Sequence, residues 1–148
     1  MCLRPWKLAF FVFLLLSLSS LPVFSQEYNP ASYVGLTLSS LIELLGVPQT
    51  VRSSRGLNEW QDDVVFVYEI GNFYIFRDRV WQVELSSAFR IRAGDTRNMV
   101  LLSFGEPVSS AGDFDVFHLS GYSWPMAVRF NFDSNERVTM IYIFRSDL

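Results

Sequence analysis

The sequence contains two similar segments, and this apparent duplication constrains the fold more than any other feature. The first segment begins at Gly35-Leu36-Thr37 and ends at Gly46-Val47-Pro48. The second begins at Gly94-Asp95-Thr96 and ends at Gly105-Glu106-Pro107. The interval between the two boundary glycines is the same in both segments. We therefore expect one supersecondary unit to occur twice, an arrangement that favours a binding protein over an enzyme.

Each segment has the pattern of a short amphipathic helix. In the first, Thr37 can cap the free amides of a helix over Leu38–Leu45, whose leucines and isoleucine recur at intervals of three and four. Gly46 can adopt the left-handed conformation that ends a helix. The second segment repeats the pattern, with Asp95 or Thr96 as the cap.

After each helix the apolar period changes from 3.6 to 2, which indicates strands. Arg77-Asp78 has the length of a tight hairpin turn. The sequence thus predicts an α+β fold with two tandem repeats, each a short helix followed by an antiparallel β-meander of three or four strands. The expected strands are Thr50–Arg55, Glu59–Glu69, Asn72–Phe76, Arg79–Leu85, Phe114–Leu119, Met126–Phe132 and Arg137–Phe144.

The segment 1–25 has the layout of a secretory signal peptide. Arg4 and Lys7 precede the apolar run Leu8–Leu16, and small residues lead to a cleavage site after Ser25. The expected organisation is a signal peptide over 1–25, a first repeat over 26–90 and a second repeat over 91–148. We expect an exported, periplasmic or secreted protein without a stable membrane anchor after cleavage; the alternative is an uncleaved signal anchor.

The composition of the chain after Ser25 excludes several classes of function. The only cysteine, Cys2, lies in the signal segment, so disulfides, thiolate metal sites and cysteine nucleophiles are not expected. Ten arginines and fifteen acidic residues remain, a net charge of ten minus fifteen, or −5. Because the arginines are scattered along the chain and the net charge is negative, a nucleic-acid-binding surface is not expected. We expect neither a cofactor nor a metal.

Strand pairing across the two hairpins sorts their side chains into faces. We assign one face to the core, and the opposite face is also rich in apolar side chains. A sheet with one helix per repeat should have a more polar outer face, because that face is exposed to solvent. We therefore expect either that the two repeats bury their apolar outer faces against each other or that a partner covers them. The expected core residues are Tyr74, Phe76, Trp81, Val83, Leu85, Val128, Phe130, Ile141 and Ile143; those opposite are Phe73, Ile75, Val80, Val138, Met140, Tyr142 and Phe144.

The string from Gly94 to Pro107 resembles the opening signature of the small outer-membrane-assembly lipoproteins of the SmpA/OmlA type, in which Gly-x-Thr begins a helix that Gly-x-Pro closes. The duplication is similar to that of the β-lactamase-inhibitor proteins. The resemblance implies protein–protein contact in the cell envelope and carries over no site residue. Two departures are clear: the junction Phe24-Ser25-Gln26 lacks the lipid-anchor cysteine, and the disulfides of the inhibitors cannot form.

No catalytic constellation is visible. His118 is the only histidine and sits within an expected strand, so a structural or surface role is favoured. Asp62 and Asp63 are adjacent and should point to opposite faces. Asp113 and Asp115 could share a face. The loop 133–136 has oxygen ligands, but too few for a complete calcium site.

Aromatic residues are the better indication of function, because Trp, Tyr and Arg dominate interface energies. Trp60 and Trp124 lie among polar residues, and Tyr122 belongs to the same loop as Trp124. With Met140 and Tyr142 they form our candidate protein-contact surface. We expect Trp81 to be core.

The sequence therefore predicts an exported, non-catalytic binding or scaffolding protein that acts on an envelope or secreted protein. The first alternative is a secreted enzyme inhibitor, which would insert loop 121–125 or loop 133–136 into a target cleft. The second is a small carbohydrate-binding or hydrolytic module that would depend on Asp113 or Asp115.

Overall fold

The computed structural model of the chain describes residues 29–55 and 63–148. The expected signal peptide and the segment that contains Trp60 and Asp62 lie outside the described residues. The helices are η1 (Pro30–Tyr33, a 3-10 helix), α2 (Leu38–Leu45) and α3 (Arg97–Phe104). The strands are β1 (Thr50–Ser54), β2 (Asp63–Tyr68), β3 (Gly71–Phe76), β4 (Arg79–Leu85), β5 (Ser87–Ala88), β6 (Ile91–Arg92), β7 (Ser109–Ser110), β8 (Phe114–Leu119), β9 (Met126–Phe132) and β10 (Val138–Arg145).

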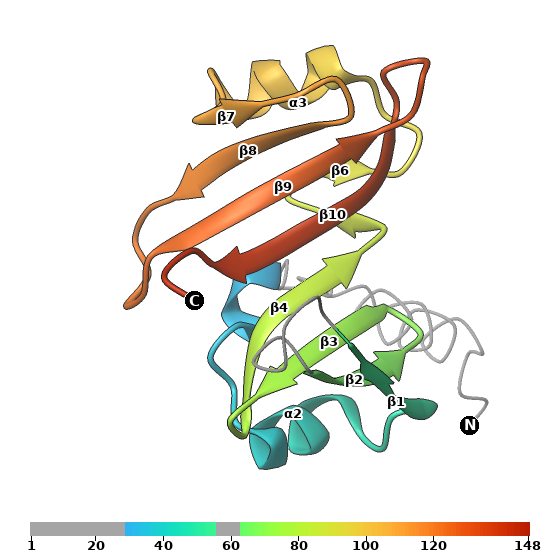
Figure 1. Cartoon of the computed structure of the whole chain (residues 1–148), viewed down its shortest axis with the longest axis vertical. Helices are drawn as coiled ribbons and strands as arrows, with labels where there is room; N and C mark the ends of the chain where they lie inside the picture. Colours follow the sequence, from blue (N-terminus) through green and yellow to red (C-terminus); the bar gives the residue numbers. More distant parts are fainter. Residues whose placement is uncertain (1–28, 56–62) are drawn as a thin grey trace, which may run out of the picture.

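Eight strands form one antiparallel sheet in the order β1-β2-β3-β4-β10-β9-β8-β7. Figure 1 shows β4 beside β10 in the middle of this sheet. There, Leu85 lies opposite Ile141 and Val83 lies opposite Ile143. The predicted fold class of two tandem helix-plus-meander repeats is therefore wrong, since strands from both halves of the chain build a single, mostly antiparallel β-sheet.

The physical reason for this correction is the cost of an open sheet edge. If each half kept its own sheet, β4 and β10 would expose rows of unpaired backbone N–H and C=O groups. Pairing them satisfies these groups and joins the apolar faces of the two halves. Hairpin patterns in a sequence report only local pairing, so they did not reveal this contact between strands from opposite halves of the chain.

The individual helices lie where the sequence places them. The hydroxyl of Thr37 accepts a hydrogen bond from Ser40 N at 3.2 Å and caps α2. Thr96, one of the two predicted caps, accepts from Met99 N at 3.4 Å and caps α3. Gly46 ends α2 with a φ of 78°. These caps fix the start and end of each helix.

An arginine from a neighbouring hairpin holds the start of each α-helix. Arg79 Nη1 donates to Gly35 O at 2.9 Å, and Arg137 Nη1 donates to Gly94 O at 2.8 Å. Both glycines have a φ of 94°, which disfavours any other residue. Each helix is thus tied at its N-terminus to a turn of the sheet.

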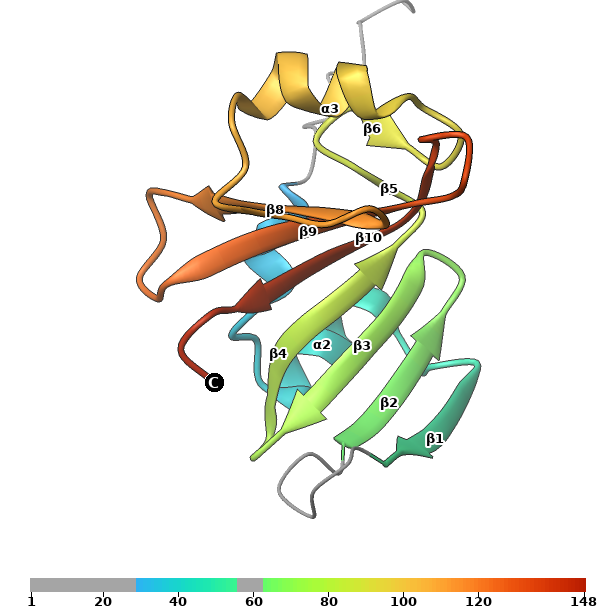
Figure 2. The same ribbon diagram turned by 45° about the horizontal axis from the view of Figure 1, so that its top comes forward.

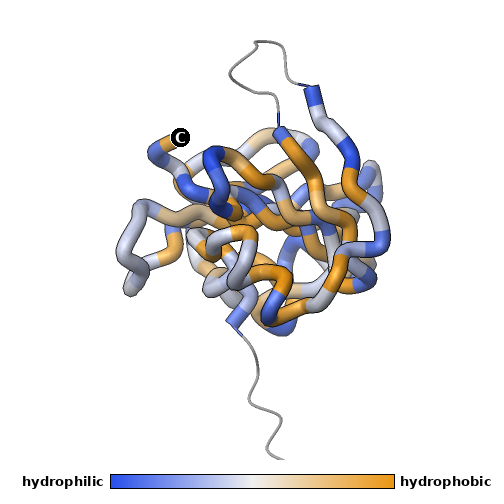
Figure 3. The backbone as a smooth tube through the Cα atoms, turned by 90° about the horizontal axis from the view of Figure 1, so that it is seen from below, coloured by the Kyte–Doolittle hydropathy of each residue, from blue (hydrophilic) through white to orange (hydrophobic). Residues whose placement is uncertain are grey.

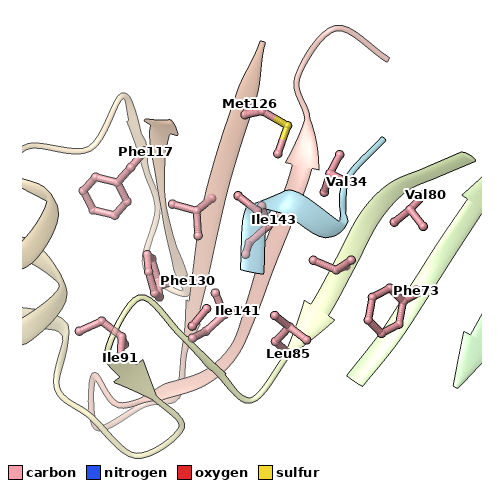
Figure 4. Packing of buried hydrophobic residues seen from close by; sticks show 14 of the residues in the cluster. Val34, Phe73, Val80, Leu85, Ile91, Phe117, Met126, Phe130, Ile141 and Ile143 are labelled. Carbon is pink, nitrogen blue, oxygen red and sulfur yellow. The ribbon is translucent and has the colours of Figure 1, made fainter. Parts of the chain in front are cut away.

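One face of the sheet carries the core. The register aligns a row of buried side chains across the sheet, and the helices contribute Leu41 from α2, Val100 from α3 and Ala31 from η1 to the same cluster. Figure 2 shows α2 behind β3 and β4, and the tube in Figure 3 shows hydrophobic stretches alternating with hydrophilic ones along the chain. Figure 4 shows Phe73, Val80, Leu85, Phe130, Ile141 and Ile143 pointing into this cluster. The row is Phe66, Phe73, Val83, Ile143, Val128 and Phe117.

Part of the predicted face assignment is wrong because of a β-bulge. Tyr74 pairs with Gln82 and Ile75 with Val80, which leaves Trp81 as an extra residue in β4. As a result, Phe73 (0% exposed), Ile75 and Val80 lie in the core. Trp81 is half-buried on the opposite face, with Tyr74 and Phe76. A second bulge, between Val138 and Met140 in β10, similarly places Val138 in the core.

A small hairpin that the sequence did not reveal links the two halves. β5 and β6 pair through a turn in which Phe89 and Arg90 have φ values of 53° and 65°. Two consecutive left-handed residues make a type I′ turn, usually built from Asn and Gly. Ala88 and Ile91 on either side of the turn are buried in the core, and their packing anchors the hairpin.

Candidate binding face of the sheet

The second face of the sheet, opposite the helices, is the candidate site. Because successive strand residues alternate, the residues between those of the core row point to this face. η1, α2 and α3 contribute their buried residues to the cluster on the other face. We call this surface the open face; its aromatic and apolar members are Tyr74, Phe76, Trp81, Met140, Tyr142, Phe144 and Phe114, and its central polar members are Asn72, Glu84, Arg129 and Asn131.

Glu84 on β4 organises the middle of the open face. Its carboxylate accepts a hydrogen bond from Asn72 Nδ2 at 3.0 Å and another from the Tyr74 hydroxyl at 2.7 Å. Burial, and then this hydrogen bond, raise the pKa of Tyr74. The tyrosine therefore stays a neutral donor at physiological pH, and its position is fixed.

Arg129 on β9 lies between two aromatic rings. Its guanidinium carbon is 4.6 Å from the ring centroid of Tyr142 and 5.6 Å from that of Phe114. Burial, and then the nearby charge of Glu84, raise the pKa of Tyr142. Arginine over aromatic faces is an arrangement worth about 0.5–2 kcal/mol, depending on exposure, and it presents a rigid, flat surface.

Two polar atoms of the open face have no hydrogen-bond partner within the described residues. They are Arg129 Nε and Asn131 Oδ1, one a donor and the other an acceptor, and both atoms are buried. Leaving such a group unpaired costs about 1–3 kcal/mol. The two residues occupy alternate positions on β9, and both atoms lie beneath the surface of the open face.

The structure divides the predicted contact residues between the two faces. Met140 and Tyr142 lie on the open face of β10, each half-buried. Tyr122 packs against the core cluster near η1, and its hydroxyl accepts a hydrogen bond from Asn29 Nδ2 at 2.7 Å. Trp60 lies outside the described residues.

Trp124 lies near the start of α2, away from the open face. A Cβ added to Gly35 would come within 2.9 Å of its ring nitrogen, so the indole lies directly over that glycine. The Arg145 guanidinium is 4.6 Å from the ring centroid. With Tyr122 bound to Asn29, these contacts hold the loop 121–125 against the protein instead of leaving it to project.

The remaining candidate residues from the sequence, His118 and the loop 133–136, do not come together into a site in the described part of the chain. His118 is exposed on β8. Asp133 Oδ1 accepts from the backbone N–H groups of Asn135 and Arg137 at 2.8 and 2.9 Å, which shapes the turn. Across the described part of the chain, no three His, Cys, Asp or Glu side chains gather as metal ligands would.

Asp115 is the one buried charged residue in the described core, with 1% exposure. Its carboxylate accepts from Arg97 Nε at 2.8 Å, from Arg97 Nη2 at 2.6 Å and from the Ser110 hydroxyl at 2.6 Å. Burial opposes its ionisation, but the hydrogen bonds from Arg97 and Ser110 outweigh this effect and lower the pKa of Asp115. The exposed Asp113 does not share this environment. The arrangement fits an ion pair that anchors α3 better than a pair of hydrolytic carboxylates.

This ion pair predicts a pH dependence of stability. The pKa of Asp115 is lower in the folded state than its ordinary value of 3.8, so the unfolded chain takes up the proton first as the pH falls. The stabilisation is thus fully present above about pH 5 and is lost progressively below about pH 4. In urea unfolding between pH 7 and pH 2.5, the gap in unfolding free energy between the unaltered chain and Asp115→Asn should narrow below pH 4.

Asp133 and Asp147 also have lowered pKa values, through hydrogen bonds from the backbone of Arg137 and the side chain of Arg145. Their contribution cancels in the comparison with Asp115→Asn because both chains retain them. A gap that stays constant to pH 2.5 would contradict the assignment of the acid sensitivity to Asp115.

The comparisons with known proteins reveal a shared fold and no family. No protein-family model matches the sequence, and no curated protein gives a significant match. The fold resembles part of an extracellular protein containing an SCP domain from Bacillus anthracis, at a TM-score of 0.59 and 9% identity over 87% of this chain and 49% of that one. It also resembles part of a cysteine-rich secretory protein from Staphylococcus aureus, at a TM-score of 0.53 and 10% identity over 82% of this chain and 47% of that one.

The chain thus spans about half the length of each solved protein it matches. At such low identity the likeness concerns the fold alone. None of the helices in residues 29–55 and 63–148 has both the length and the apolar character needed to cross a bilayer.

Sequence reasoning missed the polar centre of the open face. Asn72, Glu84 and Arg129 alternate with core residues on three different strands. Their presence between apolar neighbours was a visible signal. Asn72 and Glu84 face each other within the β3–β4 hairpin, but the sequence did not reveal that Arg129 lies near them, because that depends on the pairing of β4 with β10.

Proposed function

We propose that this chain is an exported, non-catalytic protein that binds another envelope or secreted protein through its open face. The observation that carries the proposal is the aromatic surface around Glu84 and Arg129, which the described helices leave uncovered. The sequence left two explanations for a second apolar face, mutual burial of the halves or a partner. In the structure the halves lie side by side in one sheet, which favours the partner.

The chemistry of the open face suits a protein interface. Tyrosine, tryptophan, methionine and arginine are enriched in interfaces, and buried aromatic residues and arginines carry most of the binding energy. Here Tyr74 and Tyr142 are already held by Glu84 and Arg129. Little side-chain entropy remains to be lost on binding, which lowers the cost of association.

Two independent observations support export. The segment 1–25 has the pattern of a signal peptide. The solved proteins with a similar fold are described as extracellular and as secretory. The non-catalytic character is supported by the engagement of Asp115 in an ion pair and by the isolation of His118.

Site-specific photo-cross-linking tests the proposal. A benzoylphenylalanine residue placed at Met140, in a chain expressed with its own leader in its source cells, should yield a discrete cross-linked protein. Adding Tyr142→Ala should lower that yield about tenfold or more, because removing a central aromatic anchor costs about 2 kcal/mol. Mass spectrometry of the band identifies the partner.

The matched control places the same reporter at Leu102 of α3, which is 79% exposed on the helix side of the molecule. This position should give no discrete band. Circular dichroism of each variant checks that the fold is retained. Equal cross-linking from both positions, or a yield at Met140 that Tyr142→Ala leaves unchanged, would overturn the assignment of the open face.

A further inference from the structure

The edge of the sheet at β1 is a second candidate site, separate from the open face. β1 (Thr50–Ser54) is the first strand in the sheet order, and among the described residues it pairs with β2 alone. Figure 2 shows it at the end of the sheet, beyond β2. In an antiparallel pair, alternate residues direct their N–H and C=O groups away from the partner strand. β1 therefore presents a row of backbone donors and acceptors along its outer side.

The opposite edge of the sheet differs from β1 in length and in cover. β7 comprises only Ser109 and Ser110. Arg97 Nη2 donates to the Ser110 hydroxyl at 3.0 Å and to Ala111 O at 2.8 Å, so polar groups at the end of this edge are engaged. β1 is five residues long, and its first four residues are exposed. Short strands and covered edges prevent pairing with another chain. Within the described residues, the fold protects the β7 edge in this way and leaves β1 open.

The open-face side of the β1 edge carries one positive charge. Arg52, at the centre of β1, lies opposite Val65, which in turn lies opposite Tyr74 of the open face. Arg52 is exposed, and no ion pair of the described residues includes it. Residues directly opposite each other on neighbouring strands have Cβ atoms about 4.5–5.5 Å apart, and opposite charges there are favourable. A strand added to β1 would thus gain from an acidic residue opposite Arg52.

The other side of the β1 edge is apolar. Val51, next to Arg52, points to the core side of the sheet, where it lies opposite Phe66. Val51 is nevertheless 55% exposed, and Val64, diagonal to it on β2, is 45% exposed. A strand paired with β1 would place a side chain beside Val51 and shield it from water. Because successive strand residues point to opposite faces, this edge suits a segment in which apolar and acidic residues alternate.

We infer that β1 binds an extended segment of another protein, with alternating acidic and apolar residues, as an additional strand of the sheet. In this mode of recognition, main-chain hydrogen bonds supply affinity and alternate side chains supply specificity. A second copy of this chain fits less well. The antiparallel register that pairs all of β1 with its own copy places Arg52 opposite Arg52 of that copy, and like charges in this position are destabilising. The charge of β1 thus favours an acidic strand from a partner.

The test is a fluorescence-anisotropy titration of the purified chain with labelled peptides. The Glu peptide is acetyl-Thr-Val-Glu-Val-Glu-Val-Thr-amide, and the Arg peptide has arginine in place of both glutamates. The chain as a whole is acidic, which would by itself favour the Arg peptide. We expect the Glu peptide to bind about fivefold more tightly, because it alone places an opposite charge beside Arg52.

The variant Arg52→Glu should reverse the preference between the two peptides. The matched control is Arg92→Glu, which makes the same change of charge at an exposed residue of β6, outside the eight-stranded sheet. This control should keep the preference of the unaltered chain. Circular dichroism of both variants verifies that they fold.

Two methylated forms of the Glu peptide test the contact between backbones. One form carries N-methyl groups on both glutamates, and the other carries them on the first two valines. These two sets of amides point to opposite edges of an extended strand. One form should lose about tenfold or more in affinity, because its methyl groups replace the donors that pair with β1, and the other form should bind like the unmethylated peptide.

Equal affinity of the unmethylated peptide and both methylated forms would overturn strand addition. A preference that Arg52→Glu leaves unchanged, or no binding of the Glu peptide, would overturn the site. Sedimentation of the chain alone should show a monomer; a dimer that the Glu peptide dissociates would instead assign the edge to a second copy. The open-face proposal stands or falls separately, on its cross-linking experiment.

Discussion

Replacing Asp115 with alanine should destabilise the protein by about 3 kcal/mol, because it leaves the largely buried Arg97 guanidinium with only the exposed Glu136, at 3.9 Å, as a counter-charge. The Arg97 side chain is 16% exposed. Arg97 Nε and the Ser110 hydroxyl also lose their acceptor, whereas Arg97 Nη2 keeps Ala111 O and Ser110 Oγ. Chemical denaturation followed by circular dichroism measures the loss.

The matched control is Asp113→Ala, which alters a nearby exposed aspartate and should change stability by no more than about 0.5 kcal/mol. A second variant distinguishes two causes of the loss of stability, the unpaired charge of Arg97 and the loss of packing at position 115. Arg97→Met combined with Asp115→Leu removes both charges and should recover much of the loss, since apolar replacements of buried ion pairs are often neutral. If the double variant is as unstable as Asp115→Ala, the unpaired charge is not the cause.

Replacing Ile143 with alanine should lower the free energy of unfolding by about 2–5 kcal/mol, because it opens a cavity in the core. Since the two halves of the chain share this core, both halves should be destabilised together. Ile143 is 0% exposed and faces Val83 across the junction of β4 and β10. Urea unfolding monitored by hydrogen exchange should show the amides of β3 and β9 losing protection in one transition.

Leu102→Ala, which removes a side chain that is 79% exposed, is the control and should have little effect. Two separate unfolding transitions, with β9 lost before β3, would show that the halves are independent units. That outcome would contradict a single cooperative core.

Local features of the fold could be predicted from the sequence because local physics determines them. The helix over Leu38–Leu45 follows from its cap, its apolar spacing and its terminal glycine, and its bounds are as predicted. The structure also confirms the predicted bounds of β4, β8 and β9, which follow from the alternation of apolar residues and from the turns that flank each strand. Each depends on residues within a few positions of one another.

The fold class was wrong because it depends on a distant contact. Nothing in Leu85 or Ile141 indicates that they lie opposite each other. The pairing becomes favourable only when both strands have formed with their apolar residues on the same side. Likewise, the ion pair of Arg97 and Asp115 joins a helix to a strand, and spacing alone does not reveal it.

The open face could be predicted only in part. The sequence placed three residues of β10 opposite the core, and the structure confirms this for Met140, Tyr142 and Phe144. The observed register of the β9–β10 hairpin differs from the expected one by an even number of positions, so each side chain keeps its face. Tyr74 and Trp81 were placed on the wrong side. One extra residue in β4 shifts the alternation, and a bulge has no clear signature in an apolar strand.

The position of β10 determines when the protein can complete its fold. β10, which comes after the other described strands in the sequence, lies in the middle of the sheet, between β4 and β9. Until Val138–Arg145 has been synthesised, β1 to β4 and β7 to β9 have no common neighbour to join them. A nascent chain therefore stays in two unfinished pieces until β10 has been made, and the shared core can close only then.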